Sequence, residues 1–336
     1  MTQHCCVAVL SAGSWGTAMS KVMADAGARV VLHARRGEIA DAITTTHHNP
    51  GYFPDINLPQ SVVATTDPAV ALDGADFLVL SIPAQSLRSN LAAWAPHIGP
   101  QTVVVSLMKG IESGSGLRAS QIIADVTGLP ANRIAVLSGP NLAGEIMAGQ
   151  PAAATVACPD ETVADQVQRA CHTGYFRPYT STDVVGCELG GAVKNIIALA
   201  VGTASGMGMG YNSQALLITR GLAEANRLAI AMGAHPATLS GLTGVGDLVA
   251  TCSSPLSRNR TFGVYLGEGV TVAEASTAAR QTTEGVESAA AILALADAHG
   301  VEMPITEIVS RLLSEKATLT EAAAALLQRP PKPEQL

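Results

Sequence analysis

Short apolar runs rich in β-branched residues alternate with helical stretches through the first half of the chain. Several of these runs are apolar at nearly every position, which is typical of strands whose two faces are both buried, as in a parallel sheet. Strands that alternate with helices predict a parallel sheet covered by helices. We expect eight strands, at residues 5–10, 29–34, 62–65, 77–81, 102–106, 133–137, 153–157 and 175–179.

The pattern changes near residue 184, where the strand signals end. Stretches rich in Ala, Leu and Ile at helical spacing follow as far as a proline-rich segment at residues 330–333. This predicts an α/β domain with a doubly wound sheet over residues 1–184, an all-α domain over residues 185–330 and a tail at residues 331–336. A helix that begins near Asp183 is expected to lead from one domain into the other, and the alanine-rich stretches 289–298 and 322–327 are predicted as helices.

Composition and charge exclude several classes of function. Apolar residues make up 48% of the 336 positions and charged residues 14%, which indicates a compact protein. The net charge of −7, without a basic stripe, argues against a nucleic-acid partner. The six cysteines lack C-x-x-C and Cys/His metal spacing, so we expect free thiols in a reducing compartment and no metal site.

The apolar stretches do not have the pattern of a leader or a membrane span. The first residues lack a basic segment followed by a long apolar one, and we interpret them as leading into a strand. Residues 191–210 are the most membrane-like, but Lys194 and Asn195 lie among them and glycines crowd their second half, so no membrane span is expected. We therefore expect a cytoplasmic protein.

A glycine-containing turn follows the first predicted strand. Residues 11–18, Ser-Ala-Gly-Ser-Trp-Gly-Thr-Ala, have the spacing of the Rossmann-type dinucleotide fingerprint, with Ser11 in place of its first glycine. Gly13 would let the backbone approach a pyrophosphate, and Gly16 would let the helix pack on the strand with its N-terminus toward the phosphates. An ordinary strand-turn-helix fits the same residues, because Ser11 must tolerate the turn that glycine normally takes.

Two arginines end the next predicted strand. Arg35 and Arg36 lie about twenty residues beyond the glycines, where NAD-preferring domains place an acidic residue for the ribose hydroxyls. Guanidinium groups bind a 2′-phosphate bidentately, so the pair favours NADP, with NAD possible. A pair of solvated surface arginines fits the same sequence.

Polar residues follow two later strands. Lys109 comes directly after one of them, and Ser138-Gly139-Pro140-Asn141 follows the other. In open parallel sheets ligands bind beyond the carboxyl ends of the strands, so Lys109 is placed to hold an anionic ligand and the turn is placed to present N–H groups and an amide. An ordinary exposed lysine is the alternative for Lys109.

Lys194 is the strongest single candidate for chemistry. It lies in an otherwise apolar helical stretch, where an unpaired ammonium would be costly to bury. Burial and neighbouring cations can lower the pKa of a lysine, which suits proton exchange with an alcohol near neutral pH. A lysine that extends to the surface is the alternative.

A third cluster lies in the predicted helical domain, at residues 244–247 and 257–260. Arg258 with Ser257 and Asn259 offers several donors to a phosphate, and Asp247 is a plausible acceptor for a substrate hydroxyl. A helix-capping segment with solvated arginines fits equally.

The order of these motifs resembles that of bacterial NAD(P)-dependent glycerol-3-phosphate dehydrogenases. The resemblance runs from about residue 5 to residue 325 and includes Thr283-Glu284-Gly285-Val286. It implies a Rossmann domain joined to an all-helical domain, with the active site in the cleft between them. It also implies reduction of dihydroxyacetone phosphate to sn-glycerol 3-phosphate for phospholipid synthesis.

The resemblance assigns roles to individual residues. Lys194 matches the proton acceptor of the family. The substrate positions are Lys109, Gly139, Asn141, Lys194, Asp247, Ser257, Arg258 and Asn259. The cofactor positions, with the two glycines of the turn, are Gly13, Ser14, Trp15, Gly16, Arg35, Arg36, Tyr52, Lys109, Ala143, Arg258, Thr282 and Glu284. Two departures are Ser11, where the family has glycine, and Asn141, where it usually has serine or threonine.

Two other hypotheses for the function stay open. A related two-domain dehydrogenase for another hydroxy acid would share the nucleotide turn and a helical lysine, but it has no reason to keep residues 257–259. A non-catalytic NADP(H) sensor needs Arg35 and Arg36 but not Lys194. A homodimer is expected because closed two-fold assemblies are the commonest.

Overall fold

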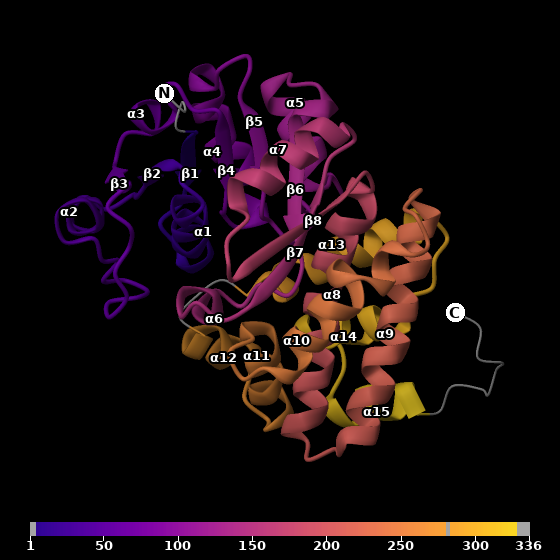
Figure 1. The fold of residues 1–336 in the computed structure, drawn as a ribbon. Coiled ribbons are helices and arrows are strands. Elements are labelled where there is room, and N and C mark those ends of the chain that lie inside the picture. The colour runs from indigo at the N-terminus through magenta and orange to yellow at the C-terminus, as the bar shows by residue number, and fades with distance from the viewer. Residues whose placement is uncertain (1–4, 280–282, 328–336) are drawn as a thin grey trace. The chain divides into compact units, whose positions relative to one another are not determined.

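A computed structural model describes residues 5–279 and 283–327 of the chain. By its internal contacts the chain divides into two compact units, one formed by residues up to 108 with 119–184, the other by residues 109–118 with those from 185 on. The sequence pattern places residues 109–118 inside the first domain and gives no sign that they belong to the second unit. Each unit is described by itself (Figure 1).

The first unit is built on one eight-stranded sheet, and all eight predicted strands are confirmed to within two residues at each end. The strands are β1 (Cys6–Leu10), β2 (Arg29–His33), β3 (Val62–Thr65), β4 (Phe77–Leu80), β5 (Val103–Ser106), β6 (Ile134–Ser138), β7 (Ala152–Ala157) and β8 (Phe176–Ser181). Their order in the sheet is β3-β2-β1-β4-β5-β6-β7-β8. The chain therefore leaves β1 toward one edge and returns to β4 on its other side, which is the doubly wound Rossmann arrangement that the pattern predicts.

The sheet is not wholly parallel, which corrects the expectation from the strand pattern. β7 runs antiparallel to β6, while every other neighbouring pair is parallel. Only the five-residue helix α6 (Ala143–Met147) lies between β6 and β7. Antiparallel neighbours can be joined by a short connection, and this one places β7 beside β6 in the opposite direction.

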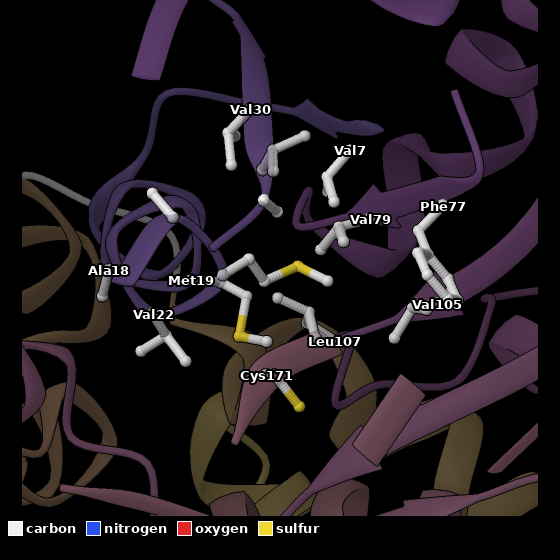
Figure 2. Close-up of a cluster of buried hydrophobic side chains, with 14 of the residues drawn as sticks. Val7, Ala18, Met19, Val22, Val30, Phe77, Val79, Val105, Leu107 and Cys171 are labelled. Carbon is white, nitrogen blue, oxygen red and sulfur yellow. The ribbon is translucent and has the colours of Figure 1, made fainter. Parts of the chain in front are cut away.

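Helices cover the sheet of the first unit. They are α1 (Ser14–Asp25), α2 (Gly37–Thr46), α3 (Pro68–Leu72), α4 (Leu87–Trp94), α5 (Ala119–Thr127), α6 and α7 (Glu161–Cys171). Met19 and Val22 of α1 belong to one buried cluster with the strand residues Val7, Val79 and Val105 (Figure 2). This packing holds the N-terminus of α1 at the end of β1.

The described part of the second unit from residue 185 onward is helical, as predicted. Its helices are α8 (Val184–Gly206), α9 (Tyr211–Ala231), α10 (Asp247–Ser253), α11 (Arg258–Gly267), α12 (Val272–Ala279), α13 (Glu284–Ala298), α14 (Pro304–Leu313) and α15 (Leu319–Leu327). The predicted helix near Asp183 is α8, and the alanine-rich stretches lie in α13 and α15.

Helix α8 forms the centre of the second unit. It is long and apolar enough to cross a membrane, but 83% of its most apolar window is buried inside the structure, as in a core helix. Small residues let its neighbours approach: a methyl group at Gly202 would lie 2.1 Å from the carbonyl oxygen of Arg260, and one at Gly263 would lie 2.2 Å from that of Leu199. α8 and α11 are therefore in backbone contact, which leaves the polar residues of α8 enclosed by protein.

Candidate functional site

Two lysines share one buried carboxylate in the second unit. The Nζ atom of Lys109 lies 2.5 Å from Oδ2 of Asp247, and the Nζ atom of Lys194 lies 2.7 Å from Oδ1. The exposed fractions of the three side chains are 12%, 10% and 2%. The sequence separates these residues by up to 138 positions, and the fold brings them into one cluster with a net positive charge.

The backbone around Asp247 explains the glycines near it. Asp247 begins α10 directly after one turn of π-helix, Leu242–Gly246, an arrangement that is common at functional sites. A methyl group at Gly244 would lie 1.8 Å from the Leu239 carbonyl oxygen, and one at Gly190 of α8 would lie 2.5 Å from that of Thr243. These glycines allow the turn to press against α8, which brings Asp247 to Lys194.

Thr251 completes the cluster, and the sequence analysis missed it. Its Oγ1 atom accepts a hydrogen bond of 2.7 Å from Lys194 and donates one of 3.2 Å to Asp247. Its signal is the spacing: Asp247 and Thr251 are four residues apart on α10 and so lie on one face of the helix. Within the described residues, the Lys194 ammonium donates one hydrogen bond to Asp247 and one to Thr251. Its third N–H group remains for a ligand.

The charged groups of the cluster shift one another's pKa values. Burial lowers the pKa of Lys109 to about 8, and the nearby Lys194 ammonium adds to this, while Asp247 opposes it. Burial by itself would raise the pKa of Asp247, but the two ammonium groups outweigh it and hold that pKa below its ordinary value. Burial raises the pKa of Glu284, against the pull of Arg258 and the two lysines. Lys109 is thus a cation that can lose its proton near neutral pH.

An amide network ties Lys109 to three helices. Asn195 of α8 donates to the carbonyl oxygen of Lys109 at 3.2 Å and to Oε2 of Glu284 at 3.4 Å. Asn259 of α11 donates to Oδ1 of Asn195 at 3.0 Å and accepts from the N–H group of Gly285 at 3.0 Å. Asn259 therefore links α11 to α8 and α13. One of its side-chain N–H groups is not used by these bonds.

The predicted phosphate cluster divides into structural and exposed members. Ser257 is buried and caps α11, since its hydroxyl accepts a hydrogen bond of 3.3 Å from the N–H group of Arg260. Arg258 is exposed at the first position of α11 and acts electrostatically on Glu284. The helix-capping interpretation thus fits Ser257, and Arg258 is the member placed to meet an anion.

In the first unit, the turn after β1 has the geometry that the fingerprint requires. A methyl group at Gly16 would lie 2.0 Å from the carbonyl oxygen of Ser11, so only glycine fits there. Gly13 precedes α1 without a side-chain cap, which leaves the first N–H groups of the helix to an anion such as a pyrophosphate. Ser14 and Trp15 open α1, and the buried Nε1 atom of Trp15 has no hydrogen-bond partner within the described residues.

Ser11 adopts a backbone conformation that favours glycine, with φ at 121°. Its hydroxyl accepts a weak hydrogen bond of 3.3 Å from the N–H group of Gly13. Such strain costs about 1 to 3 kcal/mol, and it exceeds the entropy that glycine adds to the unfolded chain. We expect Ser11→Gly to raise the free energy of unfolding by about 1 kcal/mol, seen as a rise of roughly 2–4 °C in the thermal midpoint.

The neighbouring residue offers a control for this substitution. Ala12 is not among the residues with positive φ, so Ala12→Gly should lower stability by about 0.5–1 kcal/mol through the entropy of the unfolded chain alone. A midpoint that falls equally in both variants would show that Ser11 stores no strain.

Arg35 and Arg36 come one residue after the end of β2, and both are exposed. Arg36 lies 3.5 Å from Glu38 in an ion pair whose two side chains are more than 60% exposed. Tyr52, in the loop after α2, is 38% exposed. These three residues are accessible to a ligand, and an exposed pair such as Arg36 with Glu38 contributes little to stability.

The turn after β6 contains unused polar groups. Both amide atoms of Asn141 and the hydroxyl of Ser138 are buried without a hydrogen-bond partner in the part of the chain that the structure describes. Gly139 has a φ of 145°, and a methyl group there would lie 3.0 Å from Cα of Ala154, so its glycine is explained by backbone geometry. Ala143 begins α6 and packs against the core of the first unit. Thr282 lies outside the described residues.

Comparisons with known proteins agree over nearly the whole chain. Residues 6–164 match the family model for the N-terminus of NAD-dependent glycerol-3-phosphate dehydrogenase, and residues 183–324 match the model for its C-terminus. Curated proteins named as glycerol-3-phosphate dehydrogenases (NAD(P)+) are 60% identical in Streptomyces griseus, with 99% of each chain covered, and 61% identical in Thermobifida fusca, with 98% of each covered.

A solved structure is similar as well. The crystal structure of glycerol-3-phosphate dehydrogenase from Coxiella burnetii matches with a TM-score of 0.92 and 36% identity, over 97% of this chain and 99% of that one.

Proposed function

Because this chain belongs to the NAD-dependent glycerol-3-phosphate dehydrogenase family, we propose that it interconverts dihydroxyacetone phosphate and sn-glycerol 3-phosphate with NADPH or NADH. The observation that carries the proposal is the buried cluster in which Lys109 and Lys194 share Asp247. Two cations around one carboxylate leave a net positive charge in an enclosed position. Such a cluster suits a small anionic ketone that gains a proton on reduction.

Each residue of the cluster has a separate role in the proposed reaction. Reduction adds a hydride to the carbonyl carbon and a proton to its oxygen, and the bound reduced nicotinamide supplies the hydride. Lys194 supplies the proton and takes it back in the reverse direction. Asp247 and Thr251 hold the Lys194 amine in place, and Lys109 polarises the carbonyl electrostatically.

The phosphate of the substrate needs a binding site of its own. Arg258 is exposed at the N-terminus of the ten-residue helix α11, where its guanidinium and the helix dipole both favour an anion. Asn259 contributes its remaining N–H group, and Ser257 maintains the helix end. Gly139 and Asn141 are proposed as further substrate contacts, because the buried amide of Asn141 has unused hydrogen-bonding capacity.

The first unit fits a dinucleotide. The uncapped N-terminus of α1 leaves backbone N–H groups for a pyrophosphate. The close contact at Gly16 holds the helix against the turn, and the Trp15 indole has an unused N–H group. We assign Gly13, Ser14, Trp15, Gly16, Arg35, Arg36, Tyr52 and Ala143 to cofactor binding, with Lys109, Arg258, Thr282 and Glu284 from the rest of the chain.

Arg35 and Arg36 are expected to set the preference for NADPH. Replacing both with serine should raise KM for NADPH about tenfold or more and leave KM for NADH within about twofold, because only NADPH carries the 2′-phosphate that they would bind. Steady-state kinetics with both coenzymes measures this. Arg169, an exposed arginine on α7, serves as the control. Equal effects on both coenzymes would contradict the assignment.

The lowered pKa of Lys109 predicts a pH dependence. Below about pH 8 its amine is a cation that attracts the substrate, and above that value it becomes neutral. The kcat/KM for dihydroxyacetone phosphate, which reports on the free enzyme, should therefore fall above about pH 8. Lys109→Arg keeps the charge at every accessible pH, so that variant should lose this alkaline limb, whatever its absolute rate.

The most direct test follows NADPH absorbance in the presence of dihydroxyacetone phosphate, with NADH in parallel. Oxidation of coenzyme with this ketone and not with a panel of 2-oxo acids supports the proposal. Preference for an oxo acid would favour a related hydroxy-acid dehydrogenase, and tight NADPH binding without turnover would favour a sensor.

The wider setting is also part of the proposal. The product, sn-glycerol 3-phosphate, would supply glycerophospholipid synthesis, and we propose a cytoplasmic homodimer. Among the described helices, α8 is the one that is long and apolar enough to span a membrane, and most of its apolar window is buried within the second unit.

A further inference from the structure

Residues 109–118 leave the first unit and attach to the second. Both ends of this segment continue into the first unit, at Met108 and Ala119. Inside the segment, Ile111 pairs with Arg118 in an isolated bridge and is fully buried in the core of the second unit. The segment is thus a short loop that carries Lys109 at its first position.

Helix α8 holds the segment at both ends. Asn195 donates to the Lys109 carbonyl oxygen at the first end, and Glu188 forms an ion pair with Arg118 at the other. Glu188 and Asn195 are seven residues apart on α8, which is two turns or about 10.5 Å along one face. The segment therefore lies along α8 in a fixed register, on the helix that also carries Lys194.

The ion pair is enclosed. The side chain of Arg118 is 12% exposed and that of Glu188 is 4% exposed, and these values match those of Lys109 and Asp247. A buried pair contributes more to a unique geometry than to net stability in some systems. Here the geometry concerned is that of Lys109, whose pKa depends on the nearby Asp247, Lys194 and Glu284.

We infer that Arg118 and Glu188 are positioning residues for the reaction: their ion pair fixes the register of residues 109–118 on α8 and thereby holds the Lys109 amine against Asp247. The inference rests on the proposed function, because Lys109 is a substrate contact there. Loosening the segment would let the amine reach water, and its acid-base behaviour would return toward that of an ordinary lysine.

The test replaces both partners with methionine, R118M/E188M, so that no lone charge is left buried. We expect kcat/KM for dihydroxyacetone phosphate to fall about 10- to 100-fold. The alkaline limb should move from about pH 8 toward the ordinary lysine value of 10.5. R118K, which keeps the charge, should retain most of the activity and the limb near its original position. The exposed pair Arg88 and Asp125 supplies the control, R88Q/D125N, which should change neither quantity.

A second readout does not depend on turnover. Competitive acetylation of Lys109 across a pH series, followed by peptide mass spectrometry, measures the acid-base behaviour of its amine in the free protein. If the wild type does not reduce dihydroxyacetone phosphate, the proposed function fails while this readout still decides the inference. A folded R118M/E188M with unchanged limb and labelling overturns it. Should that variant not fold, E188D decides. It keeps both charges, but its side chain is one methylene group shorter, which draws the carboxylate away from Arg118. The labelling of Lys109 must then shift if the inference holds.

Discussion

Lys194→Ala is expected to reduce turnover of dihydroxyacetone phosphate by about three to four orders of magnitude while NADPH still binds with wild-type affinity. Proton transfer by a positioned side chain accounts for about 10²- to 10⁴-fold of a rate, and Lys194 is the amine that the cluster holds with a donor to spare. Asp247 keeps its ion pair with Lys109 in the variant, so the fold should survive. Single-turnover kinetics and NADPH fluorescence titration measure the two quantities.

Lys316→Ala is the matched control, because this lysine is exposed between α14 and α15. It should leave turnover and binding unchanged. Near-normal turnover in Lys194→Ala would remove Lys194 from the chemistry. Loss of NADPH binding together with turnover would point instead to damage in the fold.

Asp247→Asn is expected to lower the free energy of unfolding by about 3–5 kcal/mol near pH 7, and to lower turnover as well. Removing one partner of a buried ion pair leaves the other uncompensated, and here one carboxylate serves two ammonium groups. Urea unfolding at pH 7 measures the loss. Because the pKa of Asp247 lies below its ordinary value of 3.8, its contribution is fully present above that pH. The difference between wild type and variant should therefore shrink only in stronger acid.

Asp125→Asn provides the comparison for this loss. Asp125 also pairs with a cation, Arg88 at 2.6 Å, but its side chain is 58% exposed. Exposed pairs contribute about 0–1 kcal/mol, so this variant should unfold near the wild-type urea concentration. If Asp247→Asn were no more destabilised than Asp125→Asn, the shared carboxylate would not hold the cluster together.

Most of the fold could be predicted from the chain. Apolar runs of strand length gave all eight strands, and the loss of that pattern near residue 184 marked the change to helices. The direction of β7 could not be predicted, because the apolar pattern of a strand does not depend on whether it runs parallel or antiparallel to its neighbour.

The candidate site was found in part. Lys109, Lys194 and Asp247 were each named from local sequence, since a charge in an apolar or glycine-rich setting is conspicuous. Thr251 was missed because a threonine in a helix is unremarkable until its partners are known. Ser257 shows the reverse case, where a hydroxyl named as a phosphate donor caps a helix.

What the sequence by itself determined is the set of elements and the residue types at their ends, because periodicity, glycines and buried charges are local properties. Only the tertiary structure decided which charges meet. Two lysines share one carboxylate, and residues 109–118 lie on α8 rather than with the strands that flank them. These pairings depend on close packing between segments far apart in the chain, where a missing methyl group at Gly190 or Gly244 lets one backbone reach another. A local sequence pattern does not indicate how closely two distant backbone segments approach each other.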